Sequence, residues 1–255
     1  MKLMNLDSAT IEITRRCNMR CDHCLRGEAQ KLDITDEILD KFFSQVYFIR
    51  SLTITGGEPS LAPDRIRAII RIAQANNVEI ANFYIVTNGK RVSQEFMDAL
   101  QEMYDFCSDN DESWVNVSRD DYHCESSKSG VSRLIDWWHD LTRDSYLWRE
   151  NGDVMFKTNK SLLNMGNALG SGDRGISVFR LDIHDTDGEN YIEGTVYVNA
   201  KGNVLPHCDF DYEHQEELPL IICSVNENIR EAIKEFGKRK IDNIYDGIDK
   251  IYDND

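Results

Sequence analysis

The sequence predicts an α/β protein, a partial (β/α)6 barrel of parallel strands with a small C-terminal appendage of a β-hairpin and a helix. Short runs rich in apolar and β-branched residues alternate with stretches whose apolar residues recur at helical spacing. This alternation is typical of parallel strands covered by helices. Polar, glycine-containing motifs follow the expected strands, so we expect them to meet at the carboxyl edge of the sheet. The pattern changes near residue 190, which predicts domains 1–189 and 190–255.

The first elements are delimited by recognisable helix starts. Ala9–Ile13 alternates as a strand does, and Thr35 is a suitable N-cap for a helix that we expect to run as far as Val46. A short β-branched strand is expected at Ser51–Thr55. Pro63 can occupy the first turn of the next helix.

The remaining elements continue the same alternation. The expected strands are Glu79–Val86, Trp114–Ser118, Asp153–Lys157 and Ile176–Ile183. The expected helices are one capped by Ser93 and one at Val131–Trp148. In the appendage, Tyr191–Asn199 and Val204–Pro206 flank a turn and predict a hairpin, followed by a helix at Asn226–Phe236.

Composition restricts the partners. The 255 residues carry 29 Lys and Arg against 45 Asp and Glu, a net charge of −16. That field repels nucleic-acid phosphates and anionic membrane surfaces, so we expect neither partner, although a local basic pocket for a small anion is compatible with it. No apolar run suits a signal peptide or a membrane span, so a cytoplasmic location is expected. In that reducing compartment the seven cysteines are metal ligands or thiols rather than disulfides.

Three cysteines form the most informative motif. Cys17, Cys21 and Cys24 have the spacing C-x3-C-x2-C, and three thiolates on one loop can hold three irons of a cubane cluster. The fourth iron could then bind S-adenosylmethionine (SAM) through its amino and carboxylate groups. A structural zinc site is the alternative, but it normally requires a fourth ligand. His23 lies within the loop, and no second C-x2-C pair follows.

With Arg16, Asn18 and His23 around the cysteines, the sequence resembles the radical SAM superfamily. The resemblance extends to a GGE segment, whose glycines admit close backbone approach and which in the family contacts the SAM amino group. It implies cofactor-binding roles for His23 and for the segment's Gly56, Gly57, Glu58 and Pro59.

Weaker matches follow two later strands. Thr87-Asn88-Gly89 resembles a TNG segment near the cofactor, which implies a role for Asn88. Val117-Ser118-Arg119-Asp120 resembles a V-S-x-D segment, which implies that Ser118 and Asp120 reach the SAM ribose. Gly166-Asn167-Ala168 departs from the family's G-R-A segment at Asn167. Each of these motifs alone is also an ordinary strand-end turn.

The resemblance implies an oxidoreductase with one 4Fe–4S cluster and SAM, which starts hydrogen-atom abstraction from a peptide or a small molecule. It also implies a small reducing partner such as a flavodoxin or ferredoxin. Two alternatives are a glycyl-radical-type activating enzyme for a partner protein and a non-catalytic metal-binding protein.

The other cysteines are harder to interpret. The segment that ends at Cys208 resembles the start of the auxiliary-cluster modules found in peptide-modifying family members, but only Cys223 follows it. Two thiolates are too few for a cluster, so we expect no second one. Cys107 and Cys124 could join only through the fold, and Cys124 is a candidate hydrogen-atom donor.

Overall fold

The computed structural model describes residues 3–118, 128–142, 156–157, 166–168, 181–186, 189–218 and 220–238. Nine strands in these residues form one open sheet in the order β5-β4-β3-β2-β1-β7-β8-β9, with β6 also paired to β7. Six strands are mutually parallel: β1 (Met4–Thr14), β2 (Val46–Gly56), β3 (Glu79–Thr87), β4 (Trp114–Ser118), β5 (Phe156–Lys157) and β7 (Glu189–Val198). Three strands run antiparallel to their partners: β6 (Asp182–Thr186), β8 (Asn203–Leu205) and β9 (Cys223–Ser224). The expected α/β class is confirmed.

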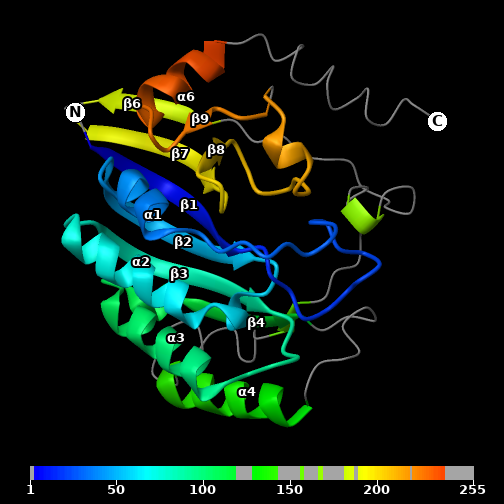
Figure 1. The fold of residues 1–255 in the computed structure, drawn as a ribbon. Helices are drawn as coiled ribbons and strands as arrows, with labels where there is room; N and C mark the ends of the chain where they lie inside the picture. The colour runs from blue at the N-terminus through cyan, green and yellow to red at the C-terminus, as the bar shows by residue number, and fades with distance from the viewer. Residues whose placement is uncertain are drawn as a thin grey trace.

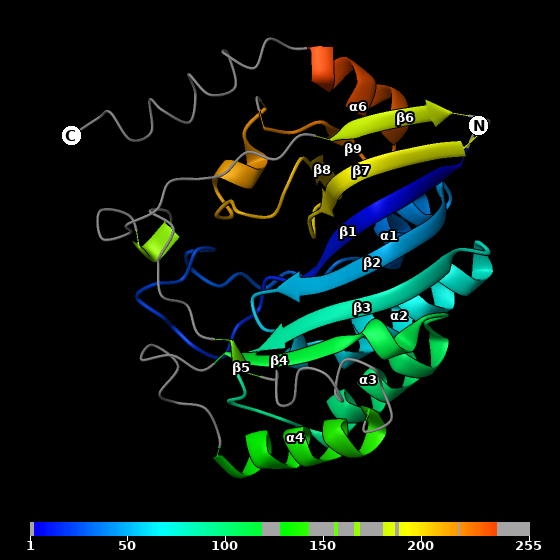
Figure 2. The ribbon, with the colours of Figure 1, turned by 180° about the vertical axis from the view of Figure 1, so that it is seen from behind.

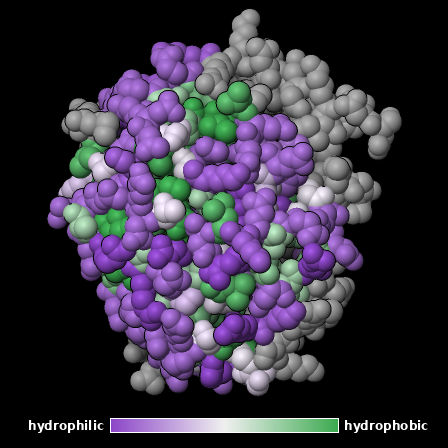
Figure 3. Space-filling view, viewed as in Figure 1, coloured by the Kyte–Doolittle hydropathy of each residue, from purple (hydrophilic) through white to green (hydrophobic). Residues whose placement is uncertain are grey.

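The helices cover one face of this sheet. They are α1 (Asp36–Phe43), α2 (Pro63–Ala75), α3 (Gln94–Phe106), α4 (Lys128–Thr142) and α6 (Ile229–Lys238). Figures 1 and 2 show α1 to α4 on one side of the strands, and the blue loop that follows β1 at the edge where β1 to β4 end. The outer surface of this helical side is mostly hydrophilic, with only scattered hydrophobic residues (Figure 3).

Strand register separates an apolar face of the sheet from a polar one. One row across the strands is almost completely buried and lies in the main core with the helices: Val198, Ile11, Ile54, Ile85 and Val115. The adjacent row points to the other face and carries polar or aromatic side chains: Tyr197, Thr10, Thr53, Tyr84 and Trp114. Because successive strand residues alternate between faces, the side without α1 to α4 is lined with hydrogen-bonding groups.

The local start signals are confirmed. Thr35 accepts a hydrogen bond from the Ile38 amide, Ser93 accepts one from the Phe96 amide, and Pro63 opens α2. The β7–β8 hairpin is also present.

One expected helix boundary and one expected strand direction are wrong. Helix α1 ends at Phe43 rather than Val46, because Ser44 caps it and Val46 begins β2. Ile183 does not lie in a further parallel strand, because β6 pairs antiparallel with β7. The sixth parallel strand is instead β7, which lies beside β1 and extends its apolar rows with Val196 and Val198.

Other expectations are described only in part. The helix expected at Val131–Trp148 is described to Thr142, and the strand expected at Asp153–Lys157 is described only as β5. A separate domain beginning at residue 190 stays a prediction, and β7 of that segment belongs to the common sheet. None of the helices in the described segments combines the length and apolarity needed to span a bilayer.

Candidate active site

The cysteine loop leaves the sheet at the carboxyl end of β1 and surrounds a pocket. Cys17, Cys21 and Cys24 are half-buried, form no disulfide and all line this pocket. Across the described residues, no three His, Cys, Asp or Glu side chains gather about a single point. In a cubane each thiolate binds a different iron, so the ligands need only surround one cavity. The three thiols therefore fit a cluster.

Opposing interactions act on the pKa of the Cys17 thiol. Burial raises the pKa of the Cys17 thiol, and the nearby Glu58 and Cys24 act in the same direction. The Met19 amide, 3.5 Å from the Cys17 sulfur, opposes this by donating to it. A bound iron would favour the thiolate directly.

The two glycines of the GGE segment are required by a backbone crossing. The Gly57 amide donates to the Thr14 carbonyl and the Glu58 amide to the Arg16 carbonyl, each at 2.8 Å. A Cβ atom at Gly56 or Gly57 would lie within 3.0 Å of the carbonyl oxygen of Thr14 or Arg16. Only glycine lets β2 continue alongside the start of the cysteine loop, and Gly57 itself lines the three-cysteine pocket.

Glu58 occupies the centre of a clamp between two strand ends. Its carboxylate is 1% exposed and accepts hydrogen bonds from the Ser60 amide at 3.0 Å, the Thr87 hydroxyl at 2.6 Å and the Asn88 amide at 2.8 Å. A carboxylate offers about four lone-pair sites, so these donors use most of them. Pro59 follows as the first residue of a 3-10 turn, Pro59–Leu61.

The TNG segment holds the start of the cysteine loop. The Asn88 side-chain amide donates to the Asn18 side chain at 2.9 Å and lies 3.9 Å from the Cys17 sulfur. Lys90 donates to the Asn18 carbonyl at 2.8 Å. Asn88 therefore lies beside the first cysteine of the loop.

The Gly166–Ala168 segment also reaches the cysteine loop. The Asn167 backbone amide donates to the Cys24 carbonyl and its side-chain amide to the Cys21 carbonyl, both at 2.9 Å. Gly166 has a φ of +61°, and a Cβ there would meet the carbonyls of Leu25 and Cys24. Asn167, the departure from the family motif, thus makes a specific contact with the loop.

The remaining predicted site residues are placed as follows. His23 is half-buried within the loop, and Ser118 is half-buried at the end of β4, in register with Lys157 of β5. Asp120 and Cys124 lie outside the described residues.

Comparison with known proteins agrees with this geometry. Residues 11–125, which contain the cysteine loop, the GGE and TNG segments and β4, match the family model of the radical SAM superfamily. This match identifies a radical SAM superfamily domain in the chain. Members of this superfamily are enzymes that bind a 4Fe–4S cluster and SAM.

Curated relatives of this radical SAM protein include two cyclases. The GTP 3',8-cyclase of Chlorobaculum tepidum is 35% identical over 101 residues, which are 38% of this chain and 30% of that protein. The probable GTP 3',8-cyclase of Methanothermobacter thermautotrophicus is 29% identical over 143 residues, 51% of this chain and 44% of that protein. The chain thus matches less than half the length of either relative.

A solved structure shares the fold. It is described as native anSMEcpe with bound AdoMet and Cp18Cys peptide, and it aligns with a TM-score of 0.56 at 13% identity, covering 91% of this chain and 80% of that one. At this identity the likeness establishes the fold alone. It supports the open, mostly parallel α/β architecture.

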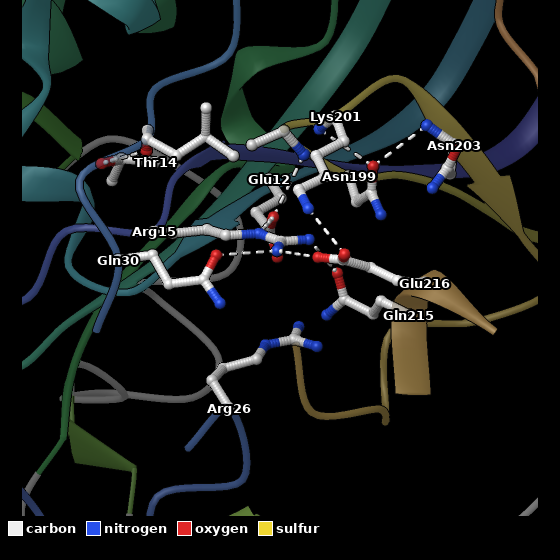
Figure 4. Close-up of polar contacts among 12 residues, drawn as sticks. Glu12, Thr14, Arg15, Arg26, Gln30, Asn199, Lys201, Asn203, Gln215 and Glu216 are labelled. Atoms are coloured by element: carbon white, nitrogen blue, oxygen red, sulfur yellow. Dashed lines mark hydrogen bonds and ion pairs between the residues drawn. The ribbon is translucent and has the colours of Figure 1, made fainter. Parts of the chain in front are cut away.

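Sequence reasoning missed a buried ionic network at the base of the cysteine loop (Figure 4). The Arg15 guanidinium is fully buried and donates to Glu12 at 2.7 Å, Glu216 at 2.9 Å, and the side chains of Gln30 and Gln215 at 3.0 Å. The only sequence signal was a glutamate in an otherwise apolar strand near a basic pair.

The same network reaches the appendage of this radical SAM protein. Glu12 accepts hydrogen bonds from the Tyr197 hydroxyl at 2.6 Å and the Ala200 amide at 3.0 Å. Burial raises the pKa of Tyr197 well above its ordinary value, so its hydroxyl keeps the proton that it donates. The network therefore joins β1, the cysteine loop and the hairpin.

The described cysteines beyond the loop are divided between two apolar clusters. Cys223 lies in the main apolar core, whereas Cys208 packs against a second apolar cluster that includes Leu205 and Phe210. Burial raises the pKa of both Cys107 and Cys223 to about 12. Such thiols remain protonated and unreactive at neutral pH.

Proposed function

We propose that this chain is a SAM-cleaving oxidoreductase in which Cys17, Cys21 and Cys24 hold one 4Fe–4S cluster. The pocket surrounded by these three thiols, with Gly57 in its lining, carries the proposal. When bound and reduced, the cluster would supply the electron that breaks a C–S bond of SAM, giving methionine and a 5′-deoxyadenosyl radical that takes a hydrogen atom from the substrate. A small flavodoxin or ferredoxin would supply that electron in the cytoplasm.

The chain's own residues would bind and orient these groups. Gly56 and Gly57 bring the backbone against the cluster loop, and Pro59 starts the turn that follows. Glu58 holds Asn88 in place, so we assign both to the geometry of the SAM site. We further propose that His23 borders the cluster and that Ser118 and Asp120 contact the SAM ribose.

The polar face of the sheet is the proposed substrate side. Thr53, Tyr84 and Trp114 lie half-buried in one row on the face opposite α1 to α4. Hydroxyl, phenol and indole groups there can orient a polar substrate above the strands. This supports an enzyme over a metal-binding protein without a catalytic role.

Two substrate classes follow from the comparisons. The curated relatives are GTP 3',8-cyclases, whose substrate is a small molecule, and the solved structure contains a peptide. We propose a small molecule as the first class to test, because the sequence relatives share 29–35% identity and the structural neighbour only 13%. A glycyl-radical-type activating enzyme is less favoured, because that class tends to lack a hairpin after the barrel and the β7–β8 hairpin is present here.

The decisive experiment is anaerobic cluster reconstitution, followed by dithionite and SAM and chromatography for 5′-deoxyadenosine. The variant with Cys17, Cys21 and Cys24 all replaced by Ala should lose both iron and product. A Cys107→Ala variant is the matched control, because its buried thiol lies in the apolar core. Unchanged iron content in the triple variant would overturn the assignment.

A further inference from the structure

Arg26 extends from the cysteine loop into the three-cysteine pocket. It lies two residues after Cys24, and its guanidinium donates to the Phe210 carbonyl at 2.6 Å. The guanidinium carbon also lies 5.4 Å from the centre of the Tyr197 ring, within the range of a cation–π contact. Two contacts from the appendage therefore hold this cation in one orientation.

Within the part of the chain that the structure describes, Arg26 has no carboxylate partner. Arg15 is paired with Glu12 and Glu216, and Glu216 also pairs with Lys201, but in Figure 4 no dashed line reaches Arg26. The residues labelled in Figure 4 thus include three cations, Arg15, Arg26 and Lys201, and two carboxylates, Glu12 and Glu216. A guanidinium is always charged and carries five N–H donors, of which the Phe210 contact uses one. A partly desolvated, unpaired cation is costly, so the site favours an anion.

Tyr212 supplies a second donor to the same pocket. Its side chain is 3% exposed, and its hydroxyl has no hydrogen-bond partner among the described residues. Its backbone amide donates to the Arg26 carbonyl at 3.2 Å, which ties the two residues together. Burial raises the pKa of Tyr212, so the hydroxyl keeps its proton. A buried hydroxyl without a partner is unfavourable unless a ligand completes it.

We propose that Arg26 and Tyr212 form an oxyanion subsite beside the three-cysteine pocket, which takes a carboxylate or phosphate group of the substrate. Guanidinium and hydroxyl donors together suit a group with several acceptor oxygens. The subsite rests on the proposed function, because that function places a substrate next to the cluster. It also accounts for a cation that has no carboxylate partner among the described residues of a chain whose net charge is −16.

The cluster's own charge is a less suitable partner. The Arg26 guanidinium lies over the ring of Tyr197, a residue of the appendage. The guanidinium is also held by the Phe210 carbonyl, on the appendage side of the pocket. An incoming substrate group therefore fits the open donors better than the thiolates do.

The test uses the reconstituted protein saturated with SAM under anaerobic conditions. Sodium phosphate and sodium acetate are titrated separately by calorimetry at constant ionic strength into the wild type, Arg26→Gln and Tyr212→Phe. Arg26→Gln should weaken anion binding roughly 10- to 150-fold and Tyr212→Phe about tenfold, because each removes a donor to a charged acceptor. Whichever anion binds more tightly identifies the substituent. Tyr212→Phe should fold normally, since its hydroxyl has no partner to lose among the described residues.

Arg20→Gln is the matched control. Arg20 lines the same pocket, but its side chain is 87% exposed and paired with Glu28, so the affinity for both anions should stay within about twofold. Wild-type affinity in Arg26→Gln and Tyr212→Phe would overturn the subsite, as would a wild type that binds neither anion. Weaker SAM binding with unchanged anion binding would also overturn it, because the donors would then serve the SAM carboxylate. The proposed function is judged separately, by 5′-deoxyadenosine from the wild type and the triple cysteine variant.

Discussion

Replacing Glu58 with Gln tests whether this residue acts on SAM or on the protein itself. The motif suggested that the carboxylate receives the SAM ammonium group. In the structure, three donors from Ser60, Thr87 and Asn88 already converge on it, and it is 1% exposed. The substitution should therefore first loosen the clamp between the ends of β2 and β3.

The size of the effect follows from these contacts. If the amide oxygen of the substituted side chain stays toward Ser60 and Thr87, its NH2 group faces the Asn88 N–H, so one hydrogen bond is lost and two donors oppose each other. A hydrogen bond to a charged group is worth about 1.5–3 kcal/mol, and an unsatisfied buried donor costs about 1–3 kcal/mol. Because relaxation recovers some of this sum, we expect Glu58→Gln to lower the free energy of unfolding by about 2–4 kcal/mol.

Urea unfolding of the reconstituted protein, followed by circular dichroism under anaerobic conditions, measures this loss. Glu28→Gln is the control, because Glu28 lines the pocket but its side chain is 73% exposed. Its effect should be within about 0.5 kcal/mol. If Glu58→Gln unfolds at the wild-type midpoint while SAM affinity falls, the clamp reasoning is refuted and the carboxylate acts on SAM directly.

Three further predictions concern the loop and the appendage. Gly57→Ala places a methyl group against a backbone carbonyl, so it should cost about 1–3 kcal/mol and lower the iron content. The control Gly237→Ala, with open space around it in helix α6, should keep the iron content and should not lower the free energy of unfolding, because alanine favours a helix more than glycine does. Equal iron in both variants would contradict the steric argument. Burial lowers the pKa of His207 from 6.5 to about 4. The unfolded chain therefore binds this proton at a higher pH than the folded chain does. As the pH is lowered from 6.5 to about 4, the free energy of unfolding should fall by about 3 kcal/mol. The His207→Asn variant should lack this decline. Parallel stability curves of the variant and the wild type from about pH 7 to about pH 5 would show that the decline does not come from His207. The double variant Cys208→Ala with Cys223→Ala should retain about four irons per chain, and a fall from about eight to about four would reveal a second cluster.

Much of the candidate site was readable because its signals are local. Cys17, Cys21 and Cys24 lie within eight residues, so their spacing alone indicates that three thiolates can surround one cavity. The caps at Thr35 and Ser93 were equally readable, because each side chain bonds an amide three residues later. The motif identified Gly56 and Gly57 as positions of close backbone approach. It did not reveal the carbonyls of Thr14 and Arg16, which require glycine there.

The roles of several residues depended on partners distant in sequence. Glu58 was expected to contact a ligand, yet its carboxylate is held by Thr87 and Asn88 about thirty residues later. The pairing of Arg15 with Glu216 spans 201 residues, and no spacing rule relates such positions. The identity of a residue therefore does not specify the partner of its side chain, because that partner is set only when the chain folds.

The sequence by itself determined the α/β class, the cysteine loop and most local helix starts, because backbone propensity and short spacings act over a few residues. Only the tertiary structure decided that β7 lies beside β1, and that the appendage brings Tyr212 to Arg26. Strand order depends on the hydrogen bonds and buried apolar rows summed across the whole sheet, so β7 was recognisable as a strand while its neighbour was not. The proposed oxyanion subsite belongs to this second class, since its two donors are 186 positions apart and meet only through the fold.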